Sequence, residues 1–171
     1  QLAAAVVLEE FGFSATFFVV PAFLDGRLGG DDYWERWGYF GWRQLRELAT
    51  RGFEIGAHSA SHASLTHAHP EALVKETRGA KERLEQELGL PVVSFSYPHG
   101  AFNETVTDAV REAGYRLACT SVYGSNRMSQ SRFRLCRLEI TGRDRLTDFR
   151  LKLLGKYDWL AAWQRWQAAH A

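Results

Sequence analysis

The sequence predicts an α/β fold, either a (β/α) barrel or an open parallel sheet, and three observations carry that prediction. A unit recurs along the chain in which a helical segment is followed by a glycine and then by a short β-branched or aromatic run. Each run is almost continuously apolar, as expected for parallel strands that are covered on both faces. The chain has 171 residues, 46% of them hydrophobic, which is enough for one domain with a sizeable core.

The recurring unit can be followed in order along the chain. It reads LEEFGFSATFFVV at 8–20, LRELATRGFEIGAH at 45–58, LEQELGLPVVSFSYP at 84–98 and VREAGYRLACTS at 110–121. The glycine of each unit is expected to take the left-handed conformation that ends a helix. Helices that alternate with buried strands indicate βαβ connectivity. In such folds the active site lies at the carboxyl ends of the strands.

The two ends of the chain carry separate expectations. Gln1 opens the chain without a Met and already inside a helical pattern, so we expect sequence to be missing upstream. At the other end, residues 146–171 are predicted to form an amphipathic helix, in which Trp159, Trp163 and Trp166 share one face. That face is expected to cover the core or to meet a partner rather than a membrane.

Charge and cysteine content exclude several classes of protein. Lys and Arg number 21 against 20 Asp and Glu, with the signs mixed along the chain, which argues against a nucleic-acid partner. No apolar run approaches the roughly 18 to 20 residues of a membrane span. Cys119 and Cys136 lack C-x-x-C spacing and are expected to be buried free thiols. No secretory signal is visible, and the compartment stays open between cytoplasm and cell envelope.

Two histidines four residues apart follow the predicted strand FEIGA. His58 falls at the carboxyl end of that strand, and His62 lies one helical turn further on if the segment is helical, so that both imidazoles reach one metal ion. The spacing alone also fits polar residues of an ordinary loop. His67 and His69 lie before a helix that begins near Pro70, and we expect them to be solvated rather than ligands.

The next strand is followed by SFSYPHGAFN, which contains a second candidate feature. Pro98 and Gly100 are expected to turn the chain as it leaves the strand, and Asn103 to cap the following helix. Such a turn can present backbone N–H groups to a developing oxyanion. An ordinary strand-to-helix turn is the alternative interpretation.

An aromatic cluster, DDYWERWGYFGW at 31–42, precedes the helix that leads into the histidine strand. Its Trp34, Trp37, Tyr39 and Trp42 have flat rings of the kind that stack on sugars, and Trp42 is the substrate-binding candidate among them. The mixed spacing equally suits a connecting loop that packs against the domain.

Together these segments resemble a known family. ATFFVV, LATRGFEIGAHSASH, FSYPHG and AGYRLACTS, in this order, resemble the polysaccharide deacetylases of the NodB homology type, which remove N-acetyl groups from amino-sugar polymers. The stretch HSASH at 58–62 fits the family's metal motif H-[ST]-x-x-H at every position. The resemblance implies a distorted (β/α) barrel over residues 1–145, with Zn²⁺ or another divalent metal held by His58 and His62.

The sequence departs from the family pattern at three places. The family's first motif, T-F-D-D-G, supplies the general-base Asp and a metal-binding Asp on the first strand; it would lie upstream of Gln1, so that strand is apparently missing. Ser96 stands where many members have an Arg. Arg137 stands where the L-x-H motif places a general-acid His; an arginine keeps its proton at neutral pH but can stabilise negative charge.

The resemblance implies metal-assisted hydrolysis of the acetamide C–N bond of an N-acetylated glycan. The backbone N–H of His99 would donate to the oxyanion, while Tyr97 and Pro98 shape the groove. The proton for the leaving amine would come from the His99 side chain or from an upstream residue, and without the aspartates the chain itself is expected to be inactive. Two alternatives stay open: a metal-dependent amidohydrolase for small amides, and a non-catalytic glycan-binding relative, which Ser96 and Arg137 would suit.

Overall fold

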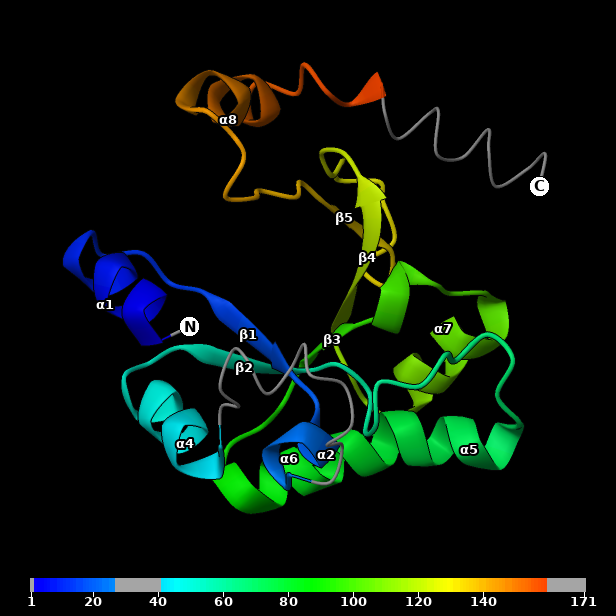
Figure 1. Ribbon diagram of the computed structural model, residues 1–171. Coiled ribbons are helices and arrows are strands. Elements are labelled where there is room, and N and C mark those ends of the chain that lie inside the picture. The colour runs from blue at the N-terminus through cyan, green and yellow to red at the C-terminus, as the bar shows by residue number, and fades with distance from the viewer. Residues whose placement is uncertain (1, 27–40, 160–171) are drawn as a thin grey trace.

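The computed structural model describes residues 2–26 and 41–159, and its centre is a parallel sheet (Figure 1). Five strands follow one another in sequence order: β1 (Thr16–Val19), β2 (Glu54–Ala57), β3 (Ser94–Ser96), β4 (Leu117–Tyr123) and β5 (Leu135–Arg137). Every neighbouring pair is parallel. All carboxyl ends therefore meet at one edge of the sheet, and the predicted α/β class is confirmed.

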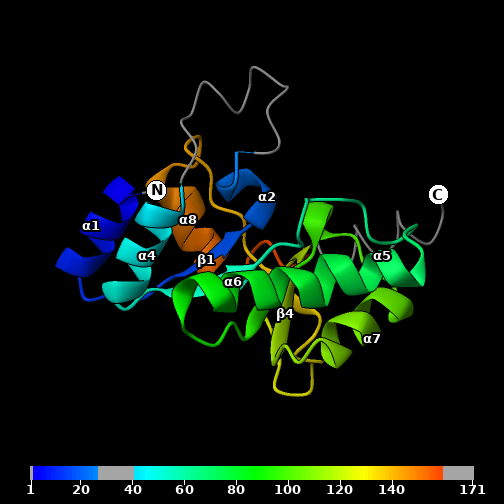
Figure 2. The same ribbon diagram turned by 90° about the horizontal axis from the view of Figure 1, so that it is seen from below.

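Helices connect the strands and cover the outer face of the sheet (Figure 2). The described helices are α1 (Leu2–Glu10), α2 (Pro21–Leu24), α4 (Trp42–Thr50), α5 (Pro70–Val74), α6 (Ala80–Leu88), α7 (Glu104–Glu112) and α8 (Leu146–Leu153), of which α1 precedes the first strand and α8 follows the last. A π-helical turn, η1 (Lys75–Gly79), joins α5 to α6, and a 3₁₀ turn, η2 (Pro98–Gly100), follows β3. None of the described helices combines the length and apolar character needed to cross a membrane.

The helix ends lie where the glycines predict them. All four glycines of the recurring unit have positive φ: Gly12, Gly52, Gly89 and Gly114. Asn103 is the N-cap of α7, and its side chain accepts a hydrogen bond of 2.9 Å from the N–H of Val106. The local signals therefore set the alternation of helices and strands as expected.

The core lies between the outer face of the sheet and the helices. Two helices contribute their apolar stripes at helical spacing, with Leu45 and Leu48 from α4 and Val106 and Val110 from α7, all with no exposed surface. They pack in one cluster with Phe95 of β3, which is equally buried. Burial of each such side chain contributes about 1.5 to 3 kcal/mol, which holds the strands in place.

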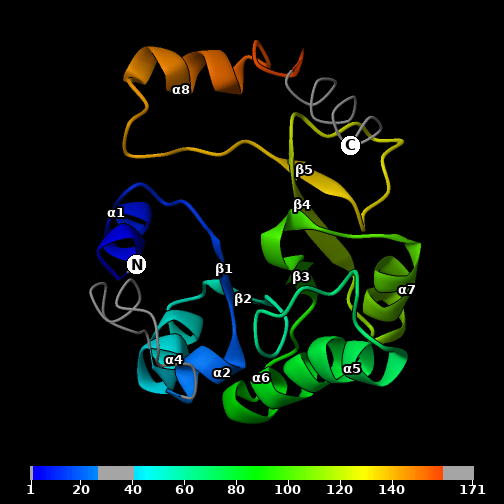
Figure 3. The ribbon, with the colours of Figure 1, turned by 45° about the vertical axis from the view of Figure 1, so that its right-hand side comes forward.

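The sheet curls so that its first and last strands approach each other. The guanidinium carbon of Arg137, on β5, lies 5.9 Å from the centre of the Phe18 ring on β1. A Cβ at Gly56 of β2 would lie 2.5 Å from that same ring, so the Phe18 side chain fills the inner face of the sheet. The inner face is thus the concave side, opposite the helices (Figure 3).

The C-terminal helix begins where the sequence predicts and ends earlier. α8 starts at Leu146, but the chain turns at 154–158, where Gly155 has a φ of +68°. Residues 160–171, with Trp163 and Trp166, lie outside the described part. α8 is positioned beyond the β5 edge of the sheet (Figure 3), where Lys152 contacts Asp144 and the carbonyl of Glu139.

Candidate active site

His58 stands directly after β2 and is held in a fixed orientation. Its backbone N–H continues the sheet by donating to the Val19 carbonyl over 2.9 Å. Its ring Nδ1 lies 2.7 Å from the carbonyl oxygen of Ser96. A carbonyl only accepts, so Nδ1 carries the hydrogen and Nε2 presents its lone pair. Burial, together with the nearby His62 and Arg137, lowers the pKa of His58 to about 4, and the imidazole is neutral at pH 7.

The segment from His58 to His62 is a loop, and the helical turn expected there is wrong. Ser59 and His62 have φ values of +58° and +63°, which no helix contains. The loop is closed by the N–H of His62, which donates to Ser59 Oγ over 2.9 Å. It still brings the His58 and His62 rings to a centroid separation of 4.9 Å. The two imidazoles are therefore neighbours, but through two left-handed residues.

Left-handed backbone is concentrated at this site. Ser59, His62 and His99 are the only non-glycine residues with positive φ among those that the structure describes. Such conformations cost about 1 to 3 kcal/mol each and persist where the surroundings enforce them. Their grouping around two histidine rings is typical of a functional site.

A buried carboxylate fixes the histidine loop, and sequence reasoning missed it. Glu76, 8% exposed, accepts from the N–H groups of Ala60 and Ser61 at 3.0 and 2.9 Å. Its other oxygen accepts from Ser61 Oγ at 2.6 Å. Glu76 belongs to the π-helical turn η1, a form common at functional sites. A buried glutamate without a hydrogen-bond partner is unfavourable. The signal available in the sequence was therefore a glutamate at a helix position where an apolar residue is expected.

Removing this carboxylate is expected to destabilise the domain. Glu76→Ala leaves two loop N–H groups without an acceptor, and we expect a loss of about 2 kcal/mol or more in the free energy of unfolding. Glu76→Gln, which keeps one acceptor oxygen, should lose less. Urea denaturation measures both. Glu82→Ala, at an exposed position of α6, is the matched control. Equal midpoints for Glu76→Ala and Glu82→Ala would contradict this assignment.

His99 lies on the turn after β3 and faces the histidine pair. Its exposed ring is 4.7 Å from the His62 ring, centre to centre. Its φ of +57° breaks the 3₁₀ turn η2, and its backbone N–H has no acceptor among the described residues. Burial and the neighbouring His99 lower the pKa of His62. The turn thus presents an N–H donor and an imidazole to one place.

Gly100 allows this turn to pack against β4. Its φ is +67°, and an added Cβ would lie 2.4 Å from Ser121 Cβ and 2.8 Å from the Ser121 backbone nitrogen. We expect Gly100→Ala to cost about 2 kcal/mol of stability through clash and strain, measured as a shift of the urea midpoint. Gly142→Ala, where a Cβ meets nothing within 4 Å, is the control and should shift the midpoint little.

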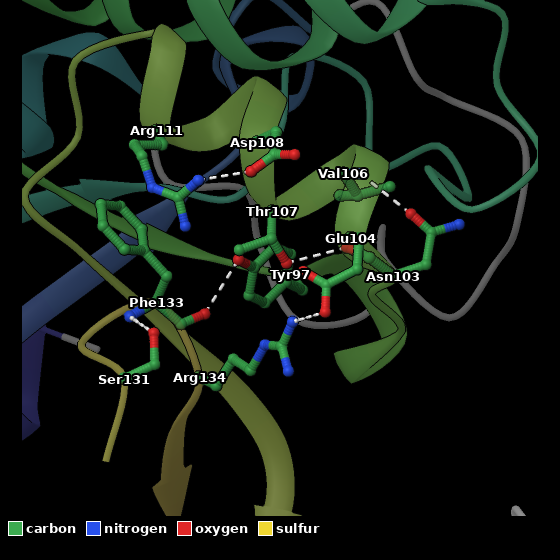
Figure 4. A network of polar contacts seen from close by, with 10 residues as sticks. All are labelled: Tyr97, Asn103, Glu104, Val106, Thr107, Asp108, Arg111, Ser131, Phe133 and Arg134. Atoms are coloured by element: carbon green, nitrogen blue, oxygen red, sulfur yellow. Dashed lines mark hydrogen bonds and ion pairs between the residues drawn. The ribbon is translucent and has the colours of Figure 1, made fainter. Parts of the chain in front are cut away.

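Tyr97 and Pro98 were expected to shape a substrate groove, and the structure corrects this. Tyr97 has no exposed surface and Pro98 is buried. Alternation along β3 directs Tyr97 to the helix side, where its hydroxyl donates to the Phe133 carbonyl over 2.9 Å (Figure 4). Its ring stacks on Phe102 at 5.4 Å. Tyr97 therefore supports the turn from behind.

Arg137 extends from β5 onto the inner face of the sheet, where its guanidinium lies against the Phe18 ring. Its Nε donates to the Thr120 carbonyl over 2.8 Å, and its charge is one of the influences that lower the pKa of His58.

Trp42, by contrast, is engaged in packing. Its indole N–H donates to Asp25 Oδ1 over 2.9 Å, and the guanidinium of Arg83 lies 5.1 Å from its ring. Sugar binding by Trp42 stays a prediction, and the rest of its cluster, 31–40, lies outside the described residues.

The donor set at this site suits a divalent metal. Two neutral imidazoles lie side by side, and one has its second nitrogen held by a carbonyl, the usual arrangement of metal-binding histidines. His67 and His69 are exposed on the segment before α5. Within residues 2–26 and 41–159, no group of three His, Cys, Asp or Glu side chains completes a metal site. His58 and His62 therefore fit as two ligands of a larger set.

Known proteins are similar to this chain in sequence and in fold. YxkH of Bacillus subtilis (strain 168), named as a predicted polysaccharide deacetylase, is 24% identical over 135 residues, 79% of this chain and 45% of YxkH. The deacetylase PplD of Streptococcus pyogenes, solved in complex with acetate, superposes with a TM-score of 0.76 at 20% identity, covering 87% of this chain and 62% of PplD. BA0330 of Bacillus anthracis, a predicted polysaccharide deacetylase, superposes with a TM-score of 0.75 at 21% identity. The superposition covers 88% of this chain and 46% of BA0330.

These likenesses agree with a match to a whole family. The structural relatives share the α/β fold with a parallel sheet, although the chain spans only about half the length of YxkH. The family model described as polysaccharide deacetylase matches residues 3–118, more than half of the chain. The matched stretch includes the histidine loop and the His99 turn. The chain therefore belongs to the polysaccharide deacetylase family.

Proposed function

We propose that this domain belongs to a metal-dependent hydrolase that removes N-acetyl groups from an amino-sugar polysaccharide or oligosaccharide. One observation carries the proposal: the hydrogen bond from His58 Nδ1 to the Ser96 carbonyl, which leaves Nε2 unprotonated on a ring whose centre lies 4.9 Å from that of the His62 ring. Together with membership in the polysaccharide deacetylase family, it supports hydrolysis of an acetamide C–N bond at this site.

His58 and His62 would hold the metal, Zn²⁺ or another divalent ion. When bound, such an ion polarises the acetamide carbonyl and lowers the pKa of a water toward about 7. The protein's own contribution is positioning. The Glu76 carboxylate holds the loop of His62, and the Ser96 carbonyl holds His58. The N–H of His99 is available to donate to the carbonyl oxygen of the acetamide as negative charge develops on it.

Proton transfer needs two further groups. The exposed His99 ring, 4.7 Å from His62, is the described side chain best placed to give a proton to the leaving amine. Arg137 holds its protons and is not a donor. We place the general base on an aspartate outside these 171 residues, as the family resemblance implies, and we expect the 171 residues alone to be inactive.

The substrate class can be tested by measuring acetate release. A longer natural chain that includes the expected aspartates should release acetate from an N-acetylglucosamine oligomer, lose activity with a chelator and regain it with Zn²⁺. Hydrolysis of a small acetamide at an equal or higher kcat/KM than the oligomer would favour the small-amide alternative. Activity that is insensitive to chelation, with tight chelators and full dialysis, would contradict metal dependence.

A second candidate function is glycan binding without catalysis, and Arg137 favours it. A guanidinium at the position expected for a general acid cannot protonate the leaving amine. A non-catalytic relative would bind the N-acetylglucosamine oligomer and release no acetate even as the longer, metal-loaded chain. Isothermal titration in parallel with the acetate assay distinguishes the two functions.

A further inference from the structure

Arg137 is held rigidly at the carboxyl end of the sheet. The ladder between β4 and β5 pairs Cys119 with Leu135 and Tyr123 with Arg137, so three residues of β4 face one of β5. This bulge leaves the Thr120 carbonyl to accept from Arg137 Nε over 2.8 Å. Bulges commonly redirect a side chain in this way. The Arg137 side chain is therefore held against β4.

The same side chain has a second contact, on the first strand of the sheet. Its guanidinium lies 5.9 Å from the Phe18 ring centre, on the opposite edge of the curled sheet. Two contacts on different strands hold the guanidinium on the inner face of the sheet, against the Phe18 ring, and that ring lies over Gly56, two residues before His58. A preorganised fork loses little entropy when it binds a planar anion.

The contacts that hold Arg137 leave some of its N–H groups without an acceptor in the described residues. Several arginines of the described chain pair with carboxylates: Arg46, Arg51, Arg83, Arg111 and Arg134. Arg137 is partnered in the described residues by the Thr120 carbonyl and the Phe18 ring, and by no carboxylate. It is also exposed, so its Nη1 and Nη2 groups are accessible to a ligand.

We propose that Arg137 binds a carboxylate of the ligand at this site. A single guanidinium matches one negative charge, and two parallel N–H groups match the two oxygens of a carboxylate. The inference rests on the proposed function, because it takes the histidine pair as the place of reaction. Two sources share this chemistry: acetate released by the reaction, and a carboxylate substituent on the sugar.

The test is a binding measurement that needs no turnover. The 171-residue chain is freed of metal over a chelating resin, and acetate, N-acetylmuramic acid and N-acetylglucosamine are titrated by saturation-transfer NMR at constant ionic strength. Arg137→Gln should weaken binding of at least one carboxylate probe roughly tenfold and leave N-acetylglucosamine unchanged. Arg137→Lys keeps the positive charge but not the planar guanidinium fork. Its affinity for the carboxylate probe should lie between that of the parent and that of Arg137→Gln.

Arg116→Gln is the matched control, since it removes the same charge from an exposed residue at the amino end of β4. It should bind all three probes as the parent does, and circular dichroism should show that each variant is folded. A loss confined to acetate assigns the site to the product, and a loss confined to N-acetylmuramic acid assigns it to the substrate. Equal carboxylate binding by the parent and Arg137→Gln, or none by the parent, overturns the proposal. The deacetylase proposal is judged separately, by acetate release.

Discussion

Replacing His58 and His62 together with alanine is expected to abolish divalent-metal binding by this chain. The two rings lie 4.9 Å apart, and the His58 ring is already oriented by the Ser96 carbonyl, so we expect the parent to bind metal without rearranging the loop. The double substitution removes both imidazole rings that we assign as metal ligands. We expect affinity for Zn²⁺ to fall by more than about 100-fold, measured by titration calorimetry and by elemental analysis after dialysis.

The neighbouring histidines supply the control for that experiment. His67 and His69 are exposed on the segment before α5, and replacing both with alanine removes the same number of imidazoles. Metal content should then equal that of the parent. If the His58 and His62 double variant retains as much metal as the parent, the assigned ligands are wrong. The thermal midpoint of each apoprotein shows whether a loss reflects unfolding instead.

The 171-residue chain is expected to show almost no deacetylase activity by itself. Two imidazoles are one short of the usual three protein ligands of a catalytic zinc, and the described residues offer no third ligand beside them. The general base is also expected elsewhere, a loss of roughly 10² to 10⁴-fold in rate. These losses affect one catalytic unit and need not multiply.

A longer chain, extended with the natural sequence that precedes Gln1, provides the comparison. It should recover acetate release from an N-acetylglucosamine oligomer, and Asn at either of the expected adjacent aspartates should remove the activity again. Chelator-sensitive release by the 171-residue chain at the rate of the longer one would show that all catalytic groups lie within these residues. Our assignment of the general base would then be wrong.

Local signals in the sequence were sufficient for the alternation of helices and strands. A glycine after each helical stretch ends that helix at low steric cost, and the apolar runs that follow are stable only when covered on both faces. Asn103 capped its helix as predicted. β5 escaped this reasoning because its three residues, Leu135 to Arg137, are too few to show a period, and pairing with β4 alone makes them a strand.

The two histidine rings lie close together, as the sequence indicated, but the backbone between them is not the expected one. The sequence determined that His58 ends a buried strand, since the apolar run before it stops there. It suggested a helical turn to His62, whereas the structure has two left-handed residues. Such residues are stable only where distant contacts enforce them. The enforcing group, Glu76, comes from a helix later in the chain, and its contact with the loop exists only in the folded protein.

The sequence by itself thus determined the parallel α/β architecture, the strand ends at which the candidate site lies and the residue types present there, because these depend on short-range periodicity and on motifs a few residues long. Tertiary structure alone decided which side chains face the site. It buried Tyr97 behind the turn, since alternation along β3 directs it to the helices, and it brought Arg137 to Phe18 of the first strand, since the curl of the sheet brings its two edges together. The face to which a side chain points and the curvature of the sheet follow from packing between residues far apart in the chain. A local sequence pattern does not predict them.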